Sequence, residues 1–469
     1  MNRSGDNLAA RLAKQIVRDL QGAGFDAFWV GGCVRDMLLG RRPGDYDIAT
    51  SARPEQIERL FKRTIAVGRQ FGVMVVVLRG RQFQVATFRA ETDYRDGRHP
   101  ETVAFGDARA DALRRDFTVN GLFYDPVADR LHDWVGGAAD LEARLIRTIG
   151  GPEQRFAEDH LRMLRALRFA VQLGFEIEPR TFAAIRALAP KIKLISAERV
   201  RDDLLKLFSG PFATPPAGGR DEKRQPASAA GTPAGSPAAR GLELLRASGL
   251  LEHVLPEVAA TVNCPQSPDY HPEGTVFEHL VLMLRHLPAE ADPLLPWAVL
   301  LHDIAKPVTA SRDPATGSIH FYEHEKIGAE MAEAILTRLR FPRKQTEVVV
   351  KAVRYHMQLK DAPHMRKATL RRVLLRPTFP LELALHRLDC LGSHGRLDVY
   401  DFLAAEAEAL RHLPQIRPPL LTGYDLMELG MKPGPAMGKL LAQIREKQLA
   451  DELKTKSQAR QWAREQLAQ

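Results

Sequence analysis

Cysteine is scarce in this chain, and long apolar runs are missing. Its 469 residues include only three cysteines, Cys33, Cys264 and Cys390, which lie far apart and form no CxxC pair. Neither a disulfide framework nor a thiolate zinc site is therefore expected, and this composition suits a reducing cytosol. The N-terminus lacks an apolar signal core, and no apolar run reaches the ~18 residues that a membrane span needs. The sequence thus predicts a cytoplasmic protein with no membrane as a partner.

Acidic residues are outnumbered by basic ones. The chain has 67 Lys and Arg against 58 Asp and Glu, which gives a formal net charge of +9. An excess of this sign suits a polyanionic partner such as RNA or nucleotides, although a solvated basic surface gives the same balance. The hydrophobic share of 45% is ordinary for a globular protein. Because the length exceeds that of a single ordinary domain, about two to four domains are expected.

Helix and strand signals alternate in the first third of the chain, and helical signals dominate the rest. In the first part, the patterns predict helices over residues 8–21 and 34–39, strands over 28–30 and 45–49, and a hairpin formed by 71–78 and 83–89. After about residue 152, they predict helices over 156–173, 181–189, 196–208 and 241–250. The expected fold class is therefore α+β, with a mixed-sheet head followed by a helical remainder.

Residues 211–240 interrupt the helical part of the chain. Pro, Ala, Gly and Ser dominate this segment, and it holds almost nothing that a core would bury. Such a composition cannot offset the entropy cost of ordering the chain, so the segment is predicted to be a disordered low-complexity insertion between helices.

Two glycines and two aspartates form the strongest local signal. Gly31 and Gly32 follow an apolar run and precede Arg35, so the backbone can approach a ligand closely and the guanidinium can contact its phosphates. Asp45 and Asp47 are two apart on an expected strand, which places them on the same side. Paired carboxylates of this kind hold Mg²⁺ ions, which bridge phosphates and activate an attacking hydroxyl. The pattern predicts a triphosphate site.

This arrangement, GGCVRD followed by DYD, resembles the first motif of the DNA polymerase β-type nucleotidyltransferases, in the version found in class II CCA-adding enzymes and bacterial poly(A) polymerases. Residues 114–120, RRDFTVN, resemble the RRDFTxN motif of that family, which implies that Arg115 and Asn120 lie near the sugar and phosphates of the nucleotide. Residues 133–141 resemble the hinge between head and neck, and residues 91–105 resemble the flexible loop of the head. The likeness is close over roughly residues 25–210.

One position departs from that family pattern. Polymerase β-type sites often carry a third acidic residue on a neighbouring strand, at the position that Gln84 occupies here. Because an amide is a poor metal ligand, the expected Mg²⁺ ligands and catalytic residues are Asp45 and Asp47 alone. A helper role for Asp116 stays open.

The next candidate motif, EDHLRMLRALR, is predicted to be helical, with Asp159 and Arg162 three apart on one face. A carboxylate accepts from an exocyclic amine and a guanidinium donates to a ring nitrogen or carbonyl, so the pair matches cytosine and adenine and mismatches uracil and guanine. An intrahelical ion pair would explain the same spacing. The likeness to the family's EDxxRxxR motif implies the base-reading role, and it adds Arg165 and Arg168 as phosphate-binding or neck-stiffening residues. Residues 196–199, SAER, resemble the last neck motif and are interpreted as structural support.

Histidine and aspartate recur in the second half of the chain. The order H…HD…H…H…D resembles the HD metal-dependent phosphohydrolase superfamily, and this resemblance implies an HD-type helical body. The candidate metal ligands are His279, His302, Asp303, His324, His356 and Asp389. Neutral imidazoles and carboxylates that converge on one pocket hold one or two divalent metals. An HD fold can also be catalytically silent and serve only as the body that holds tRNA.

The resemblances together imply a polymerase β-type nucleotidyltransferase head, an all-α neck, an HD-type body and a tail. The expected bounds are 1–150 for the head, 151–210 for the neck, 211–240 for the insertion, 241–395 for the body and 396–469 for a tRNA-binding tail. The implied activity is template-independent addition or repair of the 3′ CCA end of tRNA from CTP and ATP. A poly(A) polymerase or a CC-adding or A-adding enzyme is the alternative within the class. An HD phosphohydrolase with an RNA-binding head is the alternative from another class.

Overall fold

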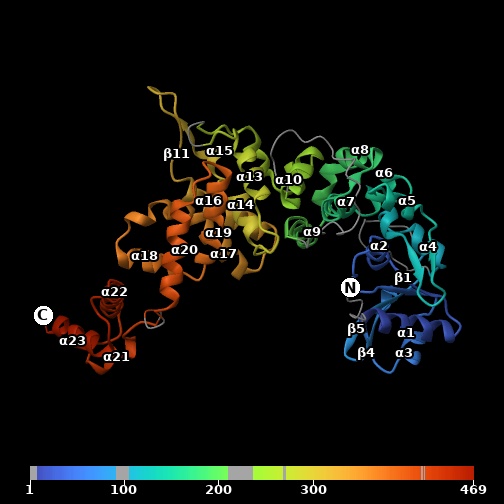
Figure 1. The fold of residues 1–469 in the computed structure, drawn as a ribbon, viewed down its shortest axis with the longest axis horizontal. Helices are drawn as coiled ribbons and strands as arrows, with labels where there is room; N and C mark the ends of the chain where they lie inside the picture. Colours follow the sequence, from blue (N-terminus) through green and yellow to red (C-terminus); the bar gives the residue numbers. More distant parts are fainter. Residues whose placement is uncertain are drawn as a thin grey trace, which may run out of the picture. The chain divides into compact units, whose positions relative to one another are not determined.

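The computed structural model describes residues 8–90, 105–209, 236–267, 271–413, 416 and 418–468. The chain divides into two compact units, Met1–Pro256 and Glu257–Gln469. The first unit contains a mixed sheet with helices and a helical extension, whereas the second is almost wholly helical (Figure 1). The expected α+β class is confirmed.

A seven-stranded sheet forms the head of the first unit, in the order β3-β4-β5-β2-β1-β6-β7. Its strands are β1 Ala27–Val30, β2 Ile48–Thr50, β3 Thr64–Gly68, β4 Val73–Leu78, β5 Arg81–Thr87, β6 Phe123–Asp125 and β7 Arg130–His132. β2 pairs with β5 in parallel, and the other neighbouring strands pair antiparallel. The predicted hairpin is confirmed as β4 and β5. All four residues of β1 are buried, which explains their apolar character.

Short helices accompany the sheet. They are α1 Leu8–Gly22, α2 Gly32–Leu38, α3 Pro54–Leu60, α4 Ala108–Leu113 and α5 Gly137–Glu142. α1 buries Leu12, Ile16 and Leu20, which recur every four residues and so form one apolar stripe against β1 and β2. The helices predicted over 8–21 and 34–39 are therefore confirmed.

The strand predicted around the two aspartates is wrong in its bounds. β2 begins at Ile48, so Asp45 and Asp47 precede it in the loop that follows α2. The amide of Val30 donates to the carbonyl of Asp47 at 3.0 Å, which fixes this loop beside the end of β1. The loop, and not the alternation of a strand, brings both carboxylates to the end of the sheet.

Helices also build the neck. They are α6 Pro152–Glu158, α7 Leu161–Leu173, α8 Pro179–Leu188, α9 Ala197–Ser209, α10 Pro237–Ala247 and α11 Leu251–Val254, with a small parallel pair of β8 Leu145–Ile146 and β9 Glu176–Ile177. The single helix predicted over 156–173 is wrong, because the chain is extended at Asp159, with φ −153° and ψ 102°. The Asp159 carboxylate accepts from the amide of Leu161 at 3.1 Å and so caps the start of α7.

The predicted insertion falls mostly on residues 210–235, which lie outside the described residues. Its C-terminal end is wrong, because α10 begins at Pro237 and buries Ala238 and Ala239. Their small side chains let α10 pack against α7 and α9. The first unit extends to Pro256, beyond the expected start of the body.

The second unit is a helical assembly with one small hairpin. Its helices are α12 Pro256–Ala260, α13 Val276–Arg285, α14 Leu295–His302, α15 Lys306–Thr309, α16 His324–Arg338, α17 Arg343–Tyr355, α18 Lys367–Leu374, α19 Phe379–Gly392, α20 Asp398–Arg411, α21 Gly423–Glu428, α22 Pro435–Leu449 and α23 Lys456–Leu467, and the hairpin is β10 Ala310–Arg312 with β11 Ile319–Phe321. Every residue of α14 is buried, and α13, α16, α17 and α19 pack around it. The last three helices share a separate apolar cluster that includes Leu426, Ile444 and Ala463.

Among the described helices, none combines the length and the apolar character that crossing a bilayer requires. All three cysteines are buried and free. Burial and the nearby charge of Asp47 raise the pKa of the Cys33 thiol to about 12, so this cysteine stays protonated beside the aspartate loop.

Candidate active site

A sharp turn ends β1 and opens toward the aspartates. Gly31 has a φ of +72°, a left-handed conformation that glycine adopts without strain. A Cβ atom at this position would lie 3.0 Å from Nη1 of Arg115, so a larger residue would also crowd that guanidinium. The turn therefore needs glycine for its backbone and for space.

Asp45 and Asp47 face a common space. Burial and the negative charge of Asp45 raise the pKa of Asp47, and Arg115 opposes this shift only in part. Two carboxylates that disfavour each other's charge are stabilised together when a divalent cation binds between them. The pair supplies hard oxygen ligands, which fit an ion such as Mg²⁺.

A cleft of about 810 Å³, here called the head–neck cleft, contains these carboxylates. Its lining consists of Gly31, Gly32, Arg35, Asp45, Asp47, Gln84, Arg114, Arg115, Asp116, Asn120, Asp159, Arg162, Arg165, Arg168, Phe169, Arg199 and Lys206. The structure thus brings together every catalytic and nucleotide-binding residue predicted for the head and neck. Arginines dominate the lining, which suits a triphosphate ligand.

Asp111 was missed by the sequence prediction, although it organises two arginines of the cleft. Its Oδ1 accepts from Nη2 of Arg114 at 2.5 Å, and its Oδ2 accepts from Nη2 of Arg115 at 3.0 Å. Burial alone would raise the pKa of Asp111, but Arg115 and Arg114 hold it below its usual value. The spacing of three and four residues from Asp111 was the available signal, since such residues share a helix face.

Asp116 links the head to the neck. Its Oδ2 accepts from Arg165 Nε at 2.9 Å, and its Oδ1 accepts from Asn120 Nδ2 at 3.2 Å. Asn120 Oδ1 accepts in turn from Arg35 Nη1 at 2.8 Å. Burial would raise the pKa of Asp116, but Arg165 and these hydrogen bonds keep it below its usual value. The ionised carboxylate therefore positions Asn120 and, through it, Arg35.

Phe169 is a common contact of three cleft arginines. The guanidinium carbons that lie within 5.5 Å of its ring centroid belong to Arg35, Arg165 and Arg168. Arg168 also pairs with Asp203 at 2.7 Å, and both side chains are 8% exposed. Because Arg165 and Arg168 have internal carboxylate partners, their contacts favour the neck-stiffening interpretation.

The predicted base-reading residues, Asp159 and Arg162, both line the cleft, but each pairs with another residue and not with the other. Arg162 Nη1 donates to Glu158 Oε2 at 2.5 Å and to the Arg155 carbonyl at 3.0 Å. Asp159 Oδ2 accepts from Arg199 Nη2 at 2.7 Å. The intrahelical ion pair is therefore wrong as an explanation of the spacing. The shared helix face is wrong too, because Asp159 lies between two helices.

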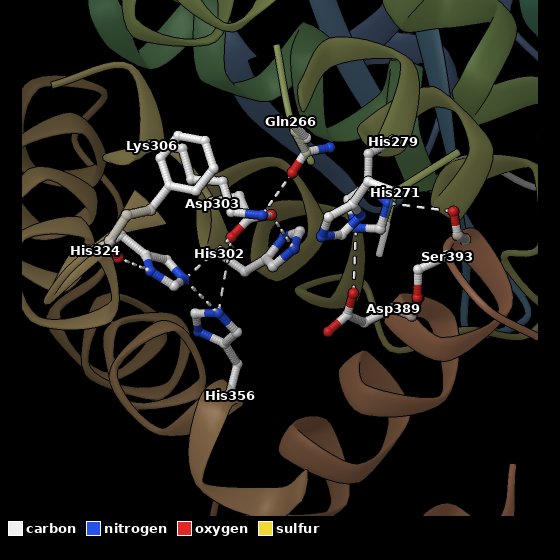
Figure 2. Close-up of polar contacts among 12 residues, drawn as sticks. Gln266, His271, His279, His302, Asp303, Lys306, His324, His356, Asp389 and Ser393 are labelled. Atoms are coloured by element: carbon white, nitrogen blue, oxygen red, sulfur yellow. Dashed lines mark hydrogen bonds and ion pairs between the residues drawn. The ribbon is translucent and has the colours of Figure 1, made fainter. Parts of the chain in front are cut away.

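The second unit gathers the predicted HD residues around α14 (Figure 2). Asp303 is central, because one of its oxygens lies 3.1 Å from Nε2 of His302 and the other lies 3.4 Å from Nε2 of His324. Nε2 of His279 lies 3.2 Å from Oδ1 of Asp389. Although burial opposes it, contacts with Asp389 and other carboxylates raise the pKa of His279 to about 9, which marks an environment that attracts cations.

Backbone carbonyls fix the tautomers of three histidines in this cluster. Nδ1 of His302, His324 and His356 donates to the carbonyl three residues earlier, at 2.8, 2.8 and 2.7 Å. Because a carbonyl can only accept, each Nδ1 carries a proton, and in the neutral imidazole each Nε2 then presents a lone pair. Nε2 of His324 and Nε2 of His356 lie 3.3 Å apart, which is unfavourable for two lone pairs unless a cation joins them. Burial, with the neighbouring His302, lowers the pKa of His356 to about 3, so this donor set fits a divalent metal.

Further polar residues of the cluster were not predicted: Gln266, His271, Glu273 and Lys306. Glu273 Oε1 accepts from Nδ1 of His279 at 2.7 Å and lies 2.9 Å from Nδ1 of His271. Nζ of Lys306 lies 2.7 Å from Oδ2 of Asp303. The spacing of three residues between Asp303 and Lys306 in HDIAK was a usable signal.

Comparison with protein families gives three matches along the chain. Residues 27–147 match the poly A polymerase head domain, and residues 174–215 match the probable RNA and SrmB-binding site of polymerase A. Residues 271–391 match the HD domain. Such heads and HD domains usually bind divalent metals, and the described residues contain candidate ligand groups for them.

Curated relatives match somewhat less than half of the chain. The CCA-adding enzyme of Staphylococcus aureus (strain MRSA252) is 46% identical over 199 residues, or 42% of this chain and 50% of that protein. The CCA-adding enzyme of Geobacillus kaustophilus is 48% identical over 198 residues, or 42% of this chain and 49% of that protein. The chain is thus similar to CCA-adding enzymes, and it contains matches to a poly A polymerase head domain and to an HD domain. The match spans about half the length of these curated relatives.

Solved structures extend the likeness to nearly the whole chain. The Bacillus stearothermophilus CCA-adding enzyme in complex with CTP is 26% identical, with a TM-score of 0.70 and 98% of each chain covered. A CCA-adding enzyme in complex with ATP has a TM-score of 0.62 at 19% identity, over 98% of this chain and 95% of that one, and shows the same fold. The predicted resemblance to class II CCA-adding enzymes and bacterial poly(A) polymerases is confirmed.

Proposed function

We propose that this protein adds nucleotides to the 3′ end of tRNA, building or repairing the CCA sequence from CTP and ATP. The observation that carries the proposal is the head–neck cleft, in which a carboxylate pair and many arginines lie beside Asp159 and Arg162. The related B. stearothermophilus enzyme was solved with CTP, one of the two nucleotides that this cleft would accept.

The reaction proposed is attack by the RNA 3′-hydroxyl on the α-phosphate of the nucleotide, with pyrophosphate as the leaving group. Asp45 and Asp47 would hold Mg²⁺, which when bound neutralises phosphate charge and acidifies the attacking hydroxyl. The Gly31 turn allows the phosphates to approach the backbone. Arg35 and Arg115, each held by a neighbouring side chain, orient the triphosphate.

Base selection is assigned to Asp159 and Arg162. Cytosine and adenine each present an amine beside an acceptor on the Watson–Crick edge, whereas uracil and guanine reverse that pattern. Asp159 accepts from the amine and Arg162 donates to the acceptor. Because Arg199 and Glu158 already hold these two groups, they are oriented before the nucleotide binds.

Pyrophosphate release tests the proposed reaction. The protein is incubated with Mg²⁺, CTP and a tRNA that lacks its CCA end, and pyrophosphate is followed over time. Release should require all three components and should stop when the 3′ diol of the tRNA has been oxidised with periodate. Release of equal rate with the oxidised tRNA would show that the 3′-hydroxyl is not the nucleophile, and the proposed reaction would be wrong.

Gln84→Glu is expected to keep or modestly raise the rate of nucleotide addition, by less than about tenfold. The position faces the cleft, and Gln84 directly precedes Val85, which pairs with Ile48 beside the two aspartates. A third carboxylate there would add a hard ligand for the metal. Initial rates at several Mg²⁺ concentrations measure the effect, with Gln84→Leu as the control that supplies no ligand. Complete loss in Gln84→Glu would mean that the amide hydrogen-bonds the nucleotide.

The same proposal covers the parts of the chain. Residues 1–150 would form the catalytic head and 151–210 the base-reading neck, with an HD-type body from about 241 to 395. The tail, 396–469, would contact tRNA, and a protein that acts on tRNA in this way would work in the cytoplasm. A poly(A) polymerase or a CC-adding or A-adding enzyme would use the same cleft residues and differ in the length of the product.

A second function, metal-dependent hydrolysis of phosphate esters in the HD cluster, is favoured by one observation. Nε2 of His324 and Nε2 of His356 lie 3.3 Å apart beside Asp303, an arrangement that a bound divalent cation would stabilise. Asp303→Asn is expected to weaken Co²⁺ binding to this cluster about tenfold or more. The substitution removes the carboxylate charge that lies beside both His279 with His302 and His324 with His356. Visible absorption during a Co²⁺ titration measures it, and nucleotide addition serves as the control that should not change. Unaltered Co²⁺ binding by Asp303→Asn would contradict the metal assignment.

A further inference from the structure

Arg199 was interpreted from the sequence as structural support, but its contacts place it in the base-reading part of the cleft. It comes from α9, 40 residues after Asp159, and its Nη2 donates to Oδ2 of Asp159 at 2.7 Å. Both side chains line the head–neck cleft, with 35% of Arg199 and 24% of Asp159 exposed. The ion pair therefore lies where the incoming base would be read.

Asp159 lies at the break between two helices. It is the extended residue between α6 and α7, and its carbonyl accepts from the amide of Arg162 at 3.0 Å. Oδ1 of its carboxylate accepts from the amide of Leu161 at 3.1 Å, and Oδ2 accepts from Arg199. Each oxygen keeps one further lone pair. With both oxygens engaged, the plane of the carboxylate and the direction of those lone pairs are fixed.

The position of Arg199 is itself fixed. One turn later on α9, Asp203 pairs with Arg168 of α7 at 2.7 Å, and both of these side chains are almost fully buried. This pair anchors α9 to the middle of α7, the helix whose start Asp159 caps. The guanidinium of Arg199 thus approaches Asp159 from a rigid support, which is what accurate positioning of a recognition group requires.

We infer that Arg199 is a positioning residue for base specificity, which holds the Asp159 carboxylate in the orientation that accepts from the amine of cytosine or adenine. This inference rests on the proposed nucleotide addition. Without Arg199 the carboxylate can rotate about its side-chain bonds and lose its preferred direction. A rotated carboxylate binds cytosine and adenine less favourably. It also disfavours the binding of uracil and guanine less. Loss of Arg199 therefore reduces discrimination between bases and leaves binding of the phosphates unchanged.

Arg199→Met tests the inference, because it keeps the length of the side chain and removes its donors. Addition rates with CTP, ATP, UTP and GTP are measured on one tRNA with the full-length protein. The ratio of kcat/KM for CTP over UTP is expected to fall at least about tenfold, since one charge-assisted hydrogen bond has been lost. Arg199→Lys, which keeps the charge but not the planar fork, should restore part of the ratio. Arg201→Met is the matched control on α9, because Arg201 pairs with the neighbouring Asp202 at 2.7 Å.

An equal fall for all four nucleotides would overturn the inference and would assign Arg199 to the phosphates or to the stability of the neck. An unchanged CTP to UTP ratio in an active Arg199→Met variant would overturn it as well. Failure of the wild-type protein to add CTP would instead refute the proposed function on which the inference rests. The outcomes for Arg199 and for the reaction are thus separate.

Discussion

Asp47→Ala is expected to abolish nucleotide addition, with a fall in turnover of at least about a thousandfold, and Asp45→Ala should do the same. The two carboxylates are the proposed metal ligands, and a metal that neutralises charge in the transition state contributes several kcal/mol, at about 1.4 kcal/mol per tenfold in rate. Burial and the charge of Asp45 raise the pKa of Asp47, and Arg115 opposes this shift only in part. Pyrophosphate release with tRNA and CTP measures the effect.

Binding of tRNA separates the metal role from a loss of folding. Both aspartate variants should bind tRNA nearly as tightly as the wild-type protein, because carboxylates repel a polyanion and do not hold it. Glu142→Ala, which removes an exposed carboxylate of the same unit, is the matched control and should add nucleotides normally. Turnover at the wild-type rate by either Asp45→Ala or Asp47→Ala would refute the assignment of the metal ligands.

Arg162→Ala should damage base selection more than the chemical step. Removing a charge-assisted hydrogen bond costs about 1.5–3 kcal/mol, so addition of CTP and ATP should fall roughly ten- to a hundredfold. For uracil and guanine, the substitution removes a donor that faces a donor of the base and makes no hydrogen bond with it. Addition of UTP and GTP should therefore fall less or rise. Rates for the four nucleotides on one tRNA measure the difference.

The control for this variant must lie in the neck but outside the cleft. Arg186→Ala fits, because Arg186 is exposed on α8 and does not line the head–neck cleft. It should leave all four rates unchanged. If Arg162→Ala lowers all four by one factor, Arg162 supports the fold through Glu158 and Arg155, and its base-reading role is wrong.

The chemistry of the cleft could be predicted because its residues lie within short sequence motifs. Gly31 and Arg35 lie in one run, Arg115 and Asn120 in another, and each run keeps its residue types at fixed spacing. The structure places all four on one cleft. The order of histidines and aspartates likewise predicted the HD cluster, since the type and order of the ligands can be read from the sequence without knowing the path of the backbone.

The local backbone could not be predicted in the same way. EDHLRMLR has the composition of a helix, yet Asp159 is extended, and its partner Arg199 comes from a helix 40 residues later. Asp45 and Asp47 precede β2, because a hydrogen bond from Val30 and not strand alternation sets their place. Such long-range contacts override local propensity, and no spacing within a short window reports them.

Helix formation at the end of the low-complexity segment has the same origin. Ala238 and Ala239 look like part of a Pro, Ala, Gly and Ser tract, but both are buried once α10 packs on α7 and α9. A small side chain gives little apolar signal in sequence and still allows close approach of two helices. The tertiary contact decides the structure of these residues.

Sizing the products made from a tRNA that lacks its CCA end tests the proposed function most directly. The wild-type protein is incubated with Mg²⁺ and with CTP, ATP, UTP or GTP alone, and with CTP and ATP together, and the RNA is resolved at single-nucleotide length. The proposed function predicts two added residues with CTP alone, three with CTP and ATP, no further growth, and no extension with UTP or GTP. A long tract made from ATP alone, or no extension under any condition, would contradict it.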